Sequence, residues 1–189
     1  MALAASLDPL LNRESAVRLA APAPDDAALD IVLRSAVSAP DHGRLRPWRF
    51  IIVRDEARLR LGEVMATALA LRQPNATPAM LDIERAKATR APLIVIVAAK
   101  IQRPSKIPDI EQILAAGAAA QNILLATYAQ GFGAMWKTGA NAYDDFVKSA
   151  LGLESSDAIV GFIYIGTSVG PPLERRRPDP HDFTAVWKG

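Results

Sequence analysis

The chain has 189 residues and a mass of 20.3 kDa, half of its residues are hydrophobic, and 22% are charged. This balance is typical of one globular domain, here residues 1–189, and excludes a disordered chain, which needs low hydrophobicity and high net charge. The sequence has no cysteine and only two histidines, so it predicts no disulfide, no thiolate nucleophile and no metal site. The formal net charge of +2 is spread along the chain, which predicts no nucleic-acid partner.

No segment predicts export or membrane insertion. The amino-terminal residues are apolar but carry no basic residue before the apolar part, unlike a secretory signal. The longest apolar stretch, residues 113–129, is interrupted by Gln121 and Asn122 and is shorter than the roughly 20 apolar residues that span a bilayer. We therefore expect a cytoplasmic protein in which this stretch is a buried helix.

Capping signals and apolar periodicity predict helices first and then strands mixed with helices, which is typical of the α+β class. Asp25 is a candidate N-cap for one helix, and Ala39-Pro40 ends it because proline cannot continue the backbone hydrogen bonds. The run LIVIVAA at residues 93–99 is apolar throughout, which predicts a strand buried on both faces. In chain order, helices are predicted at residues 8–12, 25–38, 56–72, 79–89, 110–130 and 143–151, and strands at residues 48–53, 93–99, 134–137 and 158–166.

Two features suggest close contact with a neighbouring segment or subunit. The predicted helix 110–130 is rich in alanine and has Gly117 midway, so another backbone can approach it, either within the domain or from a second chain. The tail, residues 167–189, is rich in proline and arginine and lacks periodicity, yet it contains Phe183 and Trp187. These aromatics need burial, for which a second subunit is one candidate.

Three local clusters are unusual. In residues 12–18, Arg13 and Arg18 flank Ser15 directly after a short helix, and this set of donors suits an anion such as phosphate. The alternative is a solvated helix end.

The second cluster, residues 38–50, gathers His42, three arginines and Trp48 in a loop between a helix and a strand, where binding groups concentrate. Its alternative is a plain connector whose tryptophan fills the core.

The third cluster, residues 131–140, combines glycines with Trp136 and Lys137. Glycines let the backbone approach a flat ligand, and the lysine would stabilise negative charge on that ligand. An ordinary turn and strand is the alternative.

No dinucleotide fingerprint, Walker motif, HExxH motif or serine triad is present. From spacing alone, the chain is an α+β domain without an assigned reaction.

Together, the clusters resemble the FMN-dependent nitroreductase family, in particular its short YdjA-like subgroup. Five motifs carry the resemblance in the family's order: Arg13-Glu14-Ser15, residues 38–50 with Ala-Pro-Asp-His and Pro-Trp-Arg-Phe, residues 91–98, residues 129–140, and residues 159–167. The resemblance spans about residues 10 to 167. It implies a nitroreductase-like fold with a mainly antiparallel sheet flanked by helices, and a homodimer in which the tail is exchanged or packed across the subunits.

The resemblance also implies FMN bound between the subunits, NAD(P)H as electron donor, and a nitroaromatic, quinone or similar small-molecule acceptor. It places the phosphate or ribityl chain on Arg13, Glu14 and Ser15, and the flavin ring on Trp136, Lys137 and Thr138. Ser38 and His42 would lie on the flavin from the partner subunit, and Arg44 is a further candidate for binding the flavin. The basic pair Arg176 and Arg177 resembles a phosphate-binding pair of many members. The donor nucleotide is expected beside Ala126, Thr127, Tyr128, Ala129, Gln130 and Gly131.

Two departures from the family pattern stand out. Arg44 and Arg46 replace the family's Asn and Gln, of which the Asn usually touches the flavin ring.

Because the flavin carries the chemistry, no protein acid or base is expected, and a cation such as Lys137 or Arg44 would favour the reduced flavin. The alternatives are a different reaction within the superfamily, such as dehalogenation or flavin breakdown, and a protein that binds FMN without turnover.

Overall fold

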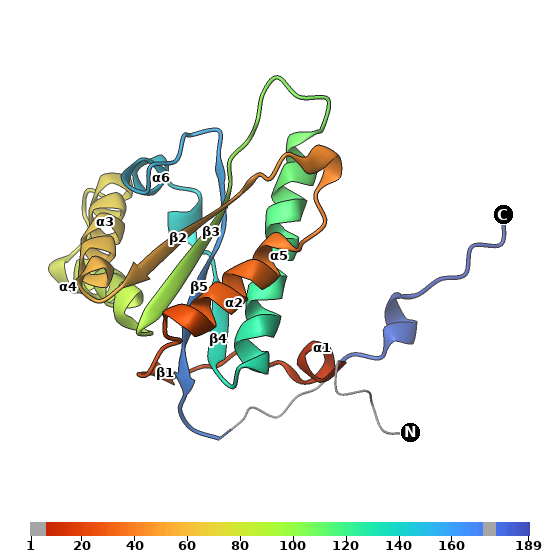
Figure 1. The fold of residues 1–189 in the computed structure, drawn as a ribbon. Coiled ribbons are helices and arrows are strands. Elements are labelled where there is room, and N and C mark those ends of the chain that lie inside the picture. The colour runs from red at the N-terminus through yellow and green to blue at the C-terminus, as the bar shows by residue number, and fades with distance from the viewer. Residues whose placement is uncertain (1–6, 172–176) are drawn as a thin grey trace.

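A five-stranded antiparallel sheet forms the centre of the structure (Figure 1). The structure is a computed structural model that describes residues 7–171 and 177–189. Four strands lie in the order β1 (Leu19–Ala20), β5 (Ala158–Ser168), β3 (Leu93–Ala99) and β2 (Trp48–Arg54), and β4 (Gly133–Lys137) also pairs with β5. All of these pairings are antiparallel. The predicted α+β class and the mainly antiparallel sheet are confirmed.

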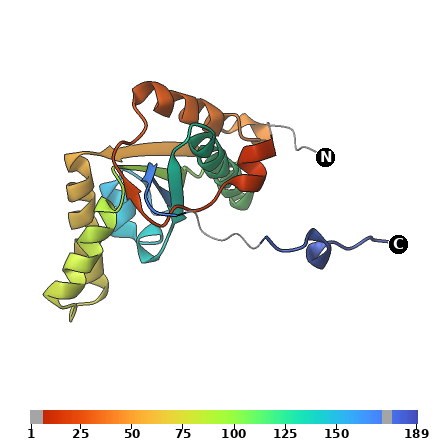
Figure 2. The same ribbon diagram turned by 90° about the horizontal axis from the view of Figure 1, so that it is seen from below.

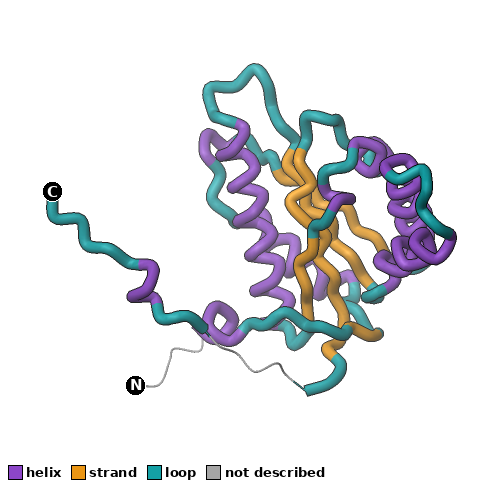
Figure 3. The backbone as a smooth tube through the Cα atoms, turned by 180° about the vertical axis from the view of Figure 1, so that it is seen from behind, coloured by secondary structure: helices purple, strands orange, loops and turns teal. Residues whose placement is uncertain are grey.

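Helices cover both faces of the sheet, as Figures 2 and 3 show from two further directions. One face carries α2 (Asp26–Val37) and α5 (Asp109–Ala129), and the short α1 (Asp8–Asn12) contacts α5. The other face carries α3 (Glu56–Arg72), α4 (Pro78–Ala86) and α6 (Asp145–Ala150). No helix in residues 7–171 and 177–189 is long and apolar enough to cross a membrane.

Strand β3 is buried along its whole length, as its unbroken apolar run predicts. Side chains alternate across a strand, so Leu93, Val95 and Val97 enter the core under α2 and α5. Ile94 and Ile96 enter the second core, under α3 and α6. One apolar strand therefore anchors both helical layers.

The structure differs from the predicted elements mainly at their ends. The fourth predicted helix ends at Ala86 and continues as a 3₁₀ turn, Lys87–Thr89, and the sixth starts at Asp145 because Asp144 caps it. Strand β1 was not predicted, since two residues are too few for a periodic signal. Its pairing with Ser168 and Thr167 extends β5 beyond the predicted end.

The described part of the tail runs away from the sheet and ends far from it (Figure 1). It contains one 3₁₀ turn, Pro180–Phe183, and is otherwise irregular. Phe183 is 78% exposed and Trp187 is 90% exposed. The two aromatics are therefore not buried within one chain.

Candidate functional site

The amino-terminal segment is held across the edge strand β4. Ser15 forms a parallel bridge with Ala134, and the Ala16 N–H donates to the Ala134 carbonyl at 2.9 Å. Gly133 makes this crossing possible, because a Cβ there would lie 2.9 Å from the Ala16 Cβ and 2.1 Å from Ser168 Oγ. The crossing fixes Arg13 and Glu14 at the start of β4.

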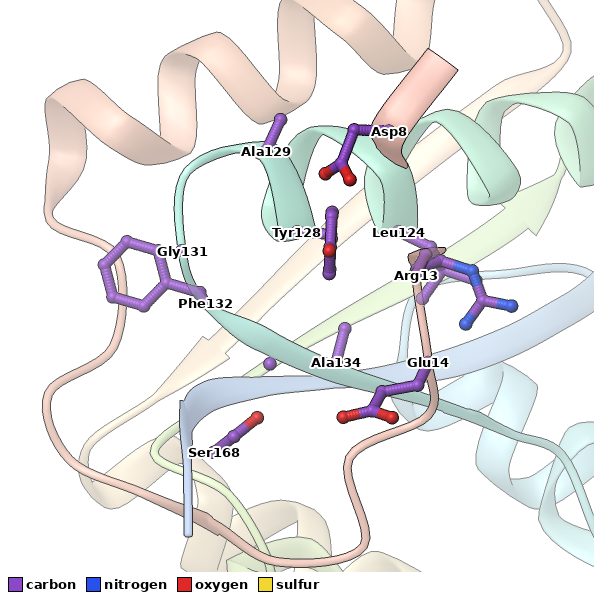
Figure 4. Close-up of a pocket in the computed structure, with 11 residues that line it drawn as sticks. Asp8, Arg13, Glu14, Leu124, Tyr128, Ala129, Gly131, Phe132, Ala134 and Ser168 are labelled. Carbon is purple, nitrogen blue, oxygen red and sulfur yellow. The ribbon is translucent and has the colours of Figure 1, made fainter. Parts of the chain in front are cut away.

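A cavity of about 380 Å³, here called the amino-terminal cavity, opens between this segment, the end of α5 and β4 (Figure 4). Its lining comes from α1 and the segment after it, from the end of α5, and from β4 and β5: Asp8, Arg13, Glu14, Leu124, Tyr128, Ala129, Gly131, Phe132, Gly133, Ala134 and Ser168. Figure 4 shows the Glu14 carboxylate directed toward Ser168 and the Arg13 guanidinium directed the opposite way.

The charges divide this region into two sides. Asp8 and Glu14 place two carboxylates in the amino-terminal cavity against the single guanidinium of Arg13. Arg177 Nη2 donates to the Arg13 carbonyl at 2.5 Å, so the tail brings a second arginine to the backbone of Arg13. An anion is therefore better matched on the side of Arg13 and Arg177 than inside the cavity. Arg176 lies outside the described residues.

A second cavity, of about 410 Å³, lies at the other end of β4 and is here called the basic cavity. It is lined by Met65, Lys87, Arg90, Trp136, Lys137, Thr138, Gly139, Ala140, Asn141, Phe162 and Tyr164. Its charged lining residues are all cations: Lys87, Arg90 and Lys137. The two cavities are separated by the length of β4, whose four steps from residue 133 to residue 137 span about 13 Å.

Tyr164 gives the basic cavity a hydroxyl group that the described residues leave without a hydrogen-bond partner. The residue is only 4% exposed, and burial raises the pKa of its hydroxyl to about 12, so it is a neutral donor at physiological pH. The hydroxyl is therefore suited to donate to a ligand in this cavity.

The side chain of Trp136, a residue that lines the basic cavity, packs against Gly161. A Cβ at Gly161 would lie 2.1 Å from Trp136 Nε1, so only glycine leaves room for the indole here. The indole N–H donates to the Val160 carbonyl at 3.1 Å. The tryptophan side chain is thus fixed, and residues 136–138 line the cavity.

Three of the predicted site residues lie elsewhere in the chain. Ser38 donates to the Ser35 carbonyl at 2.8 Å, and His42 Nδ1 lies 2.5 Å from Glu111 Oε2 at the start of α5. Arg44 is exposed and has a positive φ of 56°, next to Gly43. None of the three lines the amino-terminal or basic cavity. Within one chain, the structure does not bring them together with Arg13 or Lys137.

The predicted nucleotide stretch at the end of α5 is only partly accessible. Tyr128, Ala129 and Gly131 line the amino-terminal cavity, whereas Ala126 lines a shallow surface depression beside Ser38. Gln130 donates to the Ala28 carbonyl at 3.1 Å. Thr127 is fully buried, so it presents no side chain to either cavity.

Lys87, Arg90 and Tyr164 were not singled out from the sequence. They come from a 3₁₀ turn, the loop before β3 and the middle of β5, and only the sheet brings them beside Lys137. The available signal was a polar residue, Tyr164, inside the apolar run of β5, and two cations just before the buried strand β3. These patterns are too common to indicate a site without the fold.

Known proteins share this architecture. A nitroreductase-like family protein from Bacillus cereus has a TM-score of 0.84 at 22% identity, covering 100% of this chain and 99% of that one. A structure from Desulfovibrio desulfuricans, described as a "putative nitroreductase in complex with fmn", has a TM-score of 0.71 at 26% identity, covering 94% of each chain. The fold is therefore that of the nitroreductase-like proteins.

The sequence comparisons identify the family itself. The sequence model of the Nitroreductase family matches residues 10–167. A relative from Escherichia coli (strain K12), named "Putative NAD(P)H nitroreductase YdjA", is 39% identical over 187 residues, which cover 96% of this chain and 99% of the relative. The chain belongs to the nitroreductase family, whose members are oxidoreductases. The predicted resemblance is confirmed.

Proposed function

We propose that the protein is an FMN-dependent oxidoreductase that passes hydride from NAD(P)H, through bound FMN, to a nitroaromatic, quinone or similar acceptor. The observation that carries the proposal is the basic cavity at the end of β4, which three cations line together with Trp136 and Thr138. The FMN complex of the relative from Desulfovibrio desulfuricans supports the choice of cofactor.

The residues of the basic cavity fit the pyrimidine edge of a flavin. Its N1, O2 and O4 atoms accept hydrogen bonds, its N3–H donates one, and the edge around N1 and O2 gains negative charge on reduction. Lys87, Arg90 and Lys137 supply positive charge there, and the unpartnered Tyr164 hydroxyl supplies a donor. Cations placed where charge develops stabilise the reduced state. In the proposal, Lys137 has the role expected from the sequence, joined by Lys87 and Arg90.

The opposite end of β4 fits the phosphate. Arg13 and Arg177 lie together, and Ser15 is held beside them by its bridge to Ala134. A guanidinium offers a planar fork of donors that matches phosphate oxygens. Glu14 faces inward, so in the proposal its backbone, and not its carboxylate, contributes to this end.

When bound, FMN supplies the hydride acceptor and donor that the amino-acid side chains lack. The residues of this chain bind it at both ends, orient its ring along β4 and stabilise negative charge at the pyrimidine edge. The donor nucleotide is assigned to the accessible residues of the stretch 126–131, namely Tyr128, Ala129 and Gly131. Both half-reactions would need one face of the ring left open to donor and acceptor in turn.

The functional unit in this proposal is a homodimer in which each chain is one FMN-binding domain. The exposed Phe183 and Trp187 of the tail support it, because large apolar side chains are rarely left this exposed. On α5, Ile110 and Leu114 are also exposed, and Gly117 has open space where a Cβ would stand. Ser38, His42 and Arg44 would then reach the flavin of the partner, in an enzyme of the cytoplasm.

The direct test is the visible spectrum of the purified protein, with the released chromophore identified by chromatography. We expect a yellow protein that releases FMN and forms a dimer in sedimentation. A colourless monomer that does not bind added FMN would contradict the proposal. Steady oxidation of NAD(P)H with a nitroaromatic or quinone acceptor separates an enzyme from an FMN-binding protein without turnover. Dehalogenation or flavin breakdown would appear as different products in the same assay.

Arg13→Ala tests the phosphate end. Loss of charge-assisted hydrogen bonds to a phosphate costs about 1.5–3 kcal/mol, which corresponds to a loss of roughly 10- to 100-fold in FMN affinity. Riboflavin, which lacks the phosphate, should bind the variant and the parent protein equally. Arg60→Ala, on the exposed side of α3 in a loose pair with Glu56, is the matched control and should leave FMN affinity unchanged. Equal FMN affinity in Arg13→Ala and the parent would refute the assignment.

A further inference from the structure

A buried carboxylate lies directly behind the wall of the basic cavity. Glu84 on α4 is 7% exposed and does not itself line the cavity. Its Oε2 accepts a hydrogen bond from the Lys87 ammonium at 2.5 Å, and its Oε1 accepts one from Asn141 Nδ2 at 2.8 Å. Both partners line the cavity, so Glu84 is joined to the cavity wall at two points.

The same hydrogen-bond network connects the elements around the cavity. Asn141 lies in the 3₁₀ turn Ala140–Ala142, and its Oδ1 accepts from Arg72 Nη2, at the end of α3, at 3.3 Å. Arg72 also pairs with Asp144, whose carboxylate caps α6. Residues 138–141 both follow β4 and line the cavity. The network therefore holds Lys87 and this turn in fixed positions relative to β4.

Glu84 also affects the cavity through its charge. Lys87, Arg90 and Lys137 place three positive charges on the wall, and Glu84 sets one negative charge against them. An ionised carboxylate that is buried is costly unless it is paired, and the Lys87 ammonium supplies the pairing charge for Glu84. Tyr164 shows how far this field reaches: burial raises the pKa of its hydroxyl most, Arg90 lowers it and Glu84 raises it.

We propose that Glu84 is a positioning residue that limits how strongly the basic cavity favours the reduced form of bound flavin, by holding Lys87 and offsetting part of its charge. This inference rests on the proposed FMN site. The charges of Lys87, Arg90, Lys137 and Glu84 sum to +2, and neutralising Glu84 makes the sum +3. One unit charge about 10 Å away, at an effective dielectric constant near 20, changes the relative affinity for the reduced and oxidised forms by on the order of tenfold.

The test is Glu84→Gln, which keeps the shape and an oxygen acceptor for Asn141 but removes the charge. The readout is the midpoint potential of the bound flavin relative to free FMN, which gives the ratio of affinities for the two redox forms. We expect this ratio to rise about tenfold toward the reduced form, and Glu84→Asp to restore most of the parent value. In a Lys87→Met background, Glu84→Gln still raises the net charge by one unit, so the part of the effect that remains there measures the direct charge of Glu84 and the part that is lost measures its hold on Lys87.

Glu63→Gln is the matched control, because Glu63 also pairs with a cation, Arg85, at 2.9 Å but lies on the exposed surface outside the cavity. It should leave the ratio unchanged. If Glu84→Gln weakens the binding of both redox forms equally, or changes only the unfolding temperature, Glu84 is merely structural and the inference is wrong. If the parent protein does not bind FMN, the proposed function itself fails, which is a separate and earlier result.

Discussion

The contact between Trp136 and Gly161 allows a strong test of how the basic cavity is built. The pyrrole part of the indole lies where a Cβ at residue 161 would stand, with Nε1 at 2.1 Å and Cδ1 at 2.6 Å. These distances are far inside van der Waals contact, so Gly161→Ala must displace the indole. Displacement also breaks the indole hydrogen bond to the Val160 carbonyl.

The size of the effect follows from these two losses. Inserting a methyl group into a packed site costs about 1–3 kcal/mol, and a lost hydrogen bond costs about 0.5–1.5 kcal/mol. We therefore expect Gly161→Ala to lower the free energy of unfolding by about 3 kcal/mol. For a chain of this length, that corresponds to a fall of roughly 6 to 12 °C in the unfolding temperature. FMN affinity should fall as well, because Trp136 lines the proposed ring site.

The assay is urea unfolding of the parent, Gly161→Ala, Trp136→Ala and the double variant. Once the indole is absent, the added methyl group meets no clash, so Gly161→Ala should cost less than 1 kcal/mol in the Trp136→Ala background. Additive effects of the two substitutions would refute this account of the contact. FMN titration of the same four proteins, followed by flavin fluorescence, tests whether the displaced indole also disturbs the ring site.

Two further predictions concern the ion pair at α6 and the exposed face of α5. Burial alone raises the pKa of Asp144, but hydrogen bonds from Arg72, Val147 and Phe146 outweigh it, so its pKa lies below the usual value. Asp144→Asn, which keeps the cap, should cost about 1–2 kcal/mol at pH 7. In urea titrations at decreasing pH, the stability difference between Asp144→Asn and the parent should begin to shrink near the pKa of the unfolded Asp144 carboxyl, about 3.9. It should vanish once the pH lies below the lower pKa of the folded carboxyl. Gly117→Ala should stabilise an isolated chain by roughly 1 kcal/mol, because alanine favours a helix more than glycine does. If Gly117 lies in the proposed dimer contact, the substitution should raise the dimer dissociation constant measured by sedimentation. A tighter dimer would contradict a subunit contact at Gly117.

Much of the fold could be predicted from local sequence patterns. The apolar run of β3, the Asp25 cap and the Pro40 stop were clear because each has a local physical cause. These features need only a few neighbouring residues to be recognised. The glycines at the start of β4 were expected to face a flat ligand, whereas Gly133 lies under the crossing of Ser15 and Ala16.

The basic cavity could not be predicted in this way. Lys87, Arg90 and Tyr164 are separated by up to 77 positions in the sequence, and only strand pairing brings them together. The carboxylate of Glu84 is likewise an ordinary helix residue until Asn141 and Lys87 are placed beside it. Of its lining residues, Trp136, Lys137 and Thr138 were expected at a flavin ring, and that expectation came from the family resemblance.

Strand β5 contributes to both cavities, with Ser168 at the amino-terminal cavity and Tyr164 at the basic cavity. The strand is hydrogen-bonded to β1, β3 and β4, so it cannot stretch or bend easily. Four extended residues give a separation of about 13 Å between these two positions. In the proposed FMN site, strand β5 would therefore fix the distance between the end that holds the phosphate and the end that holds the ring.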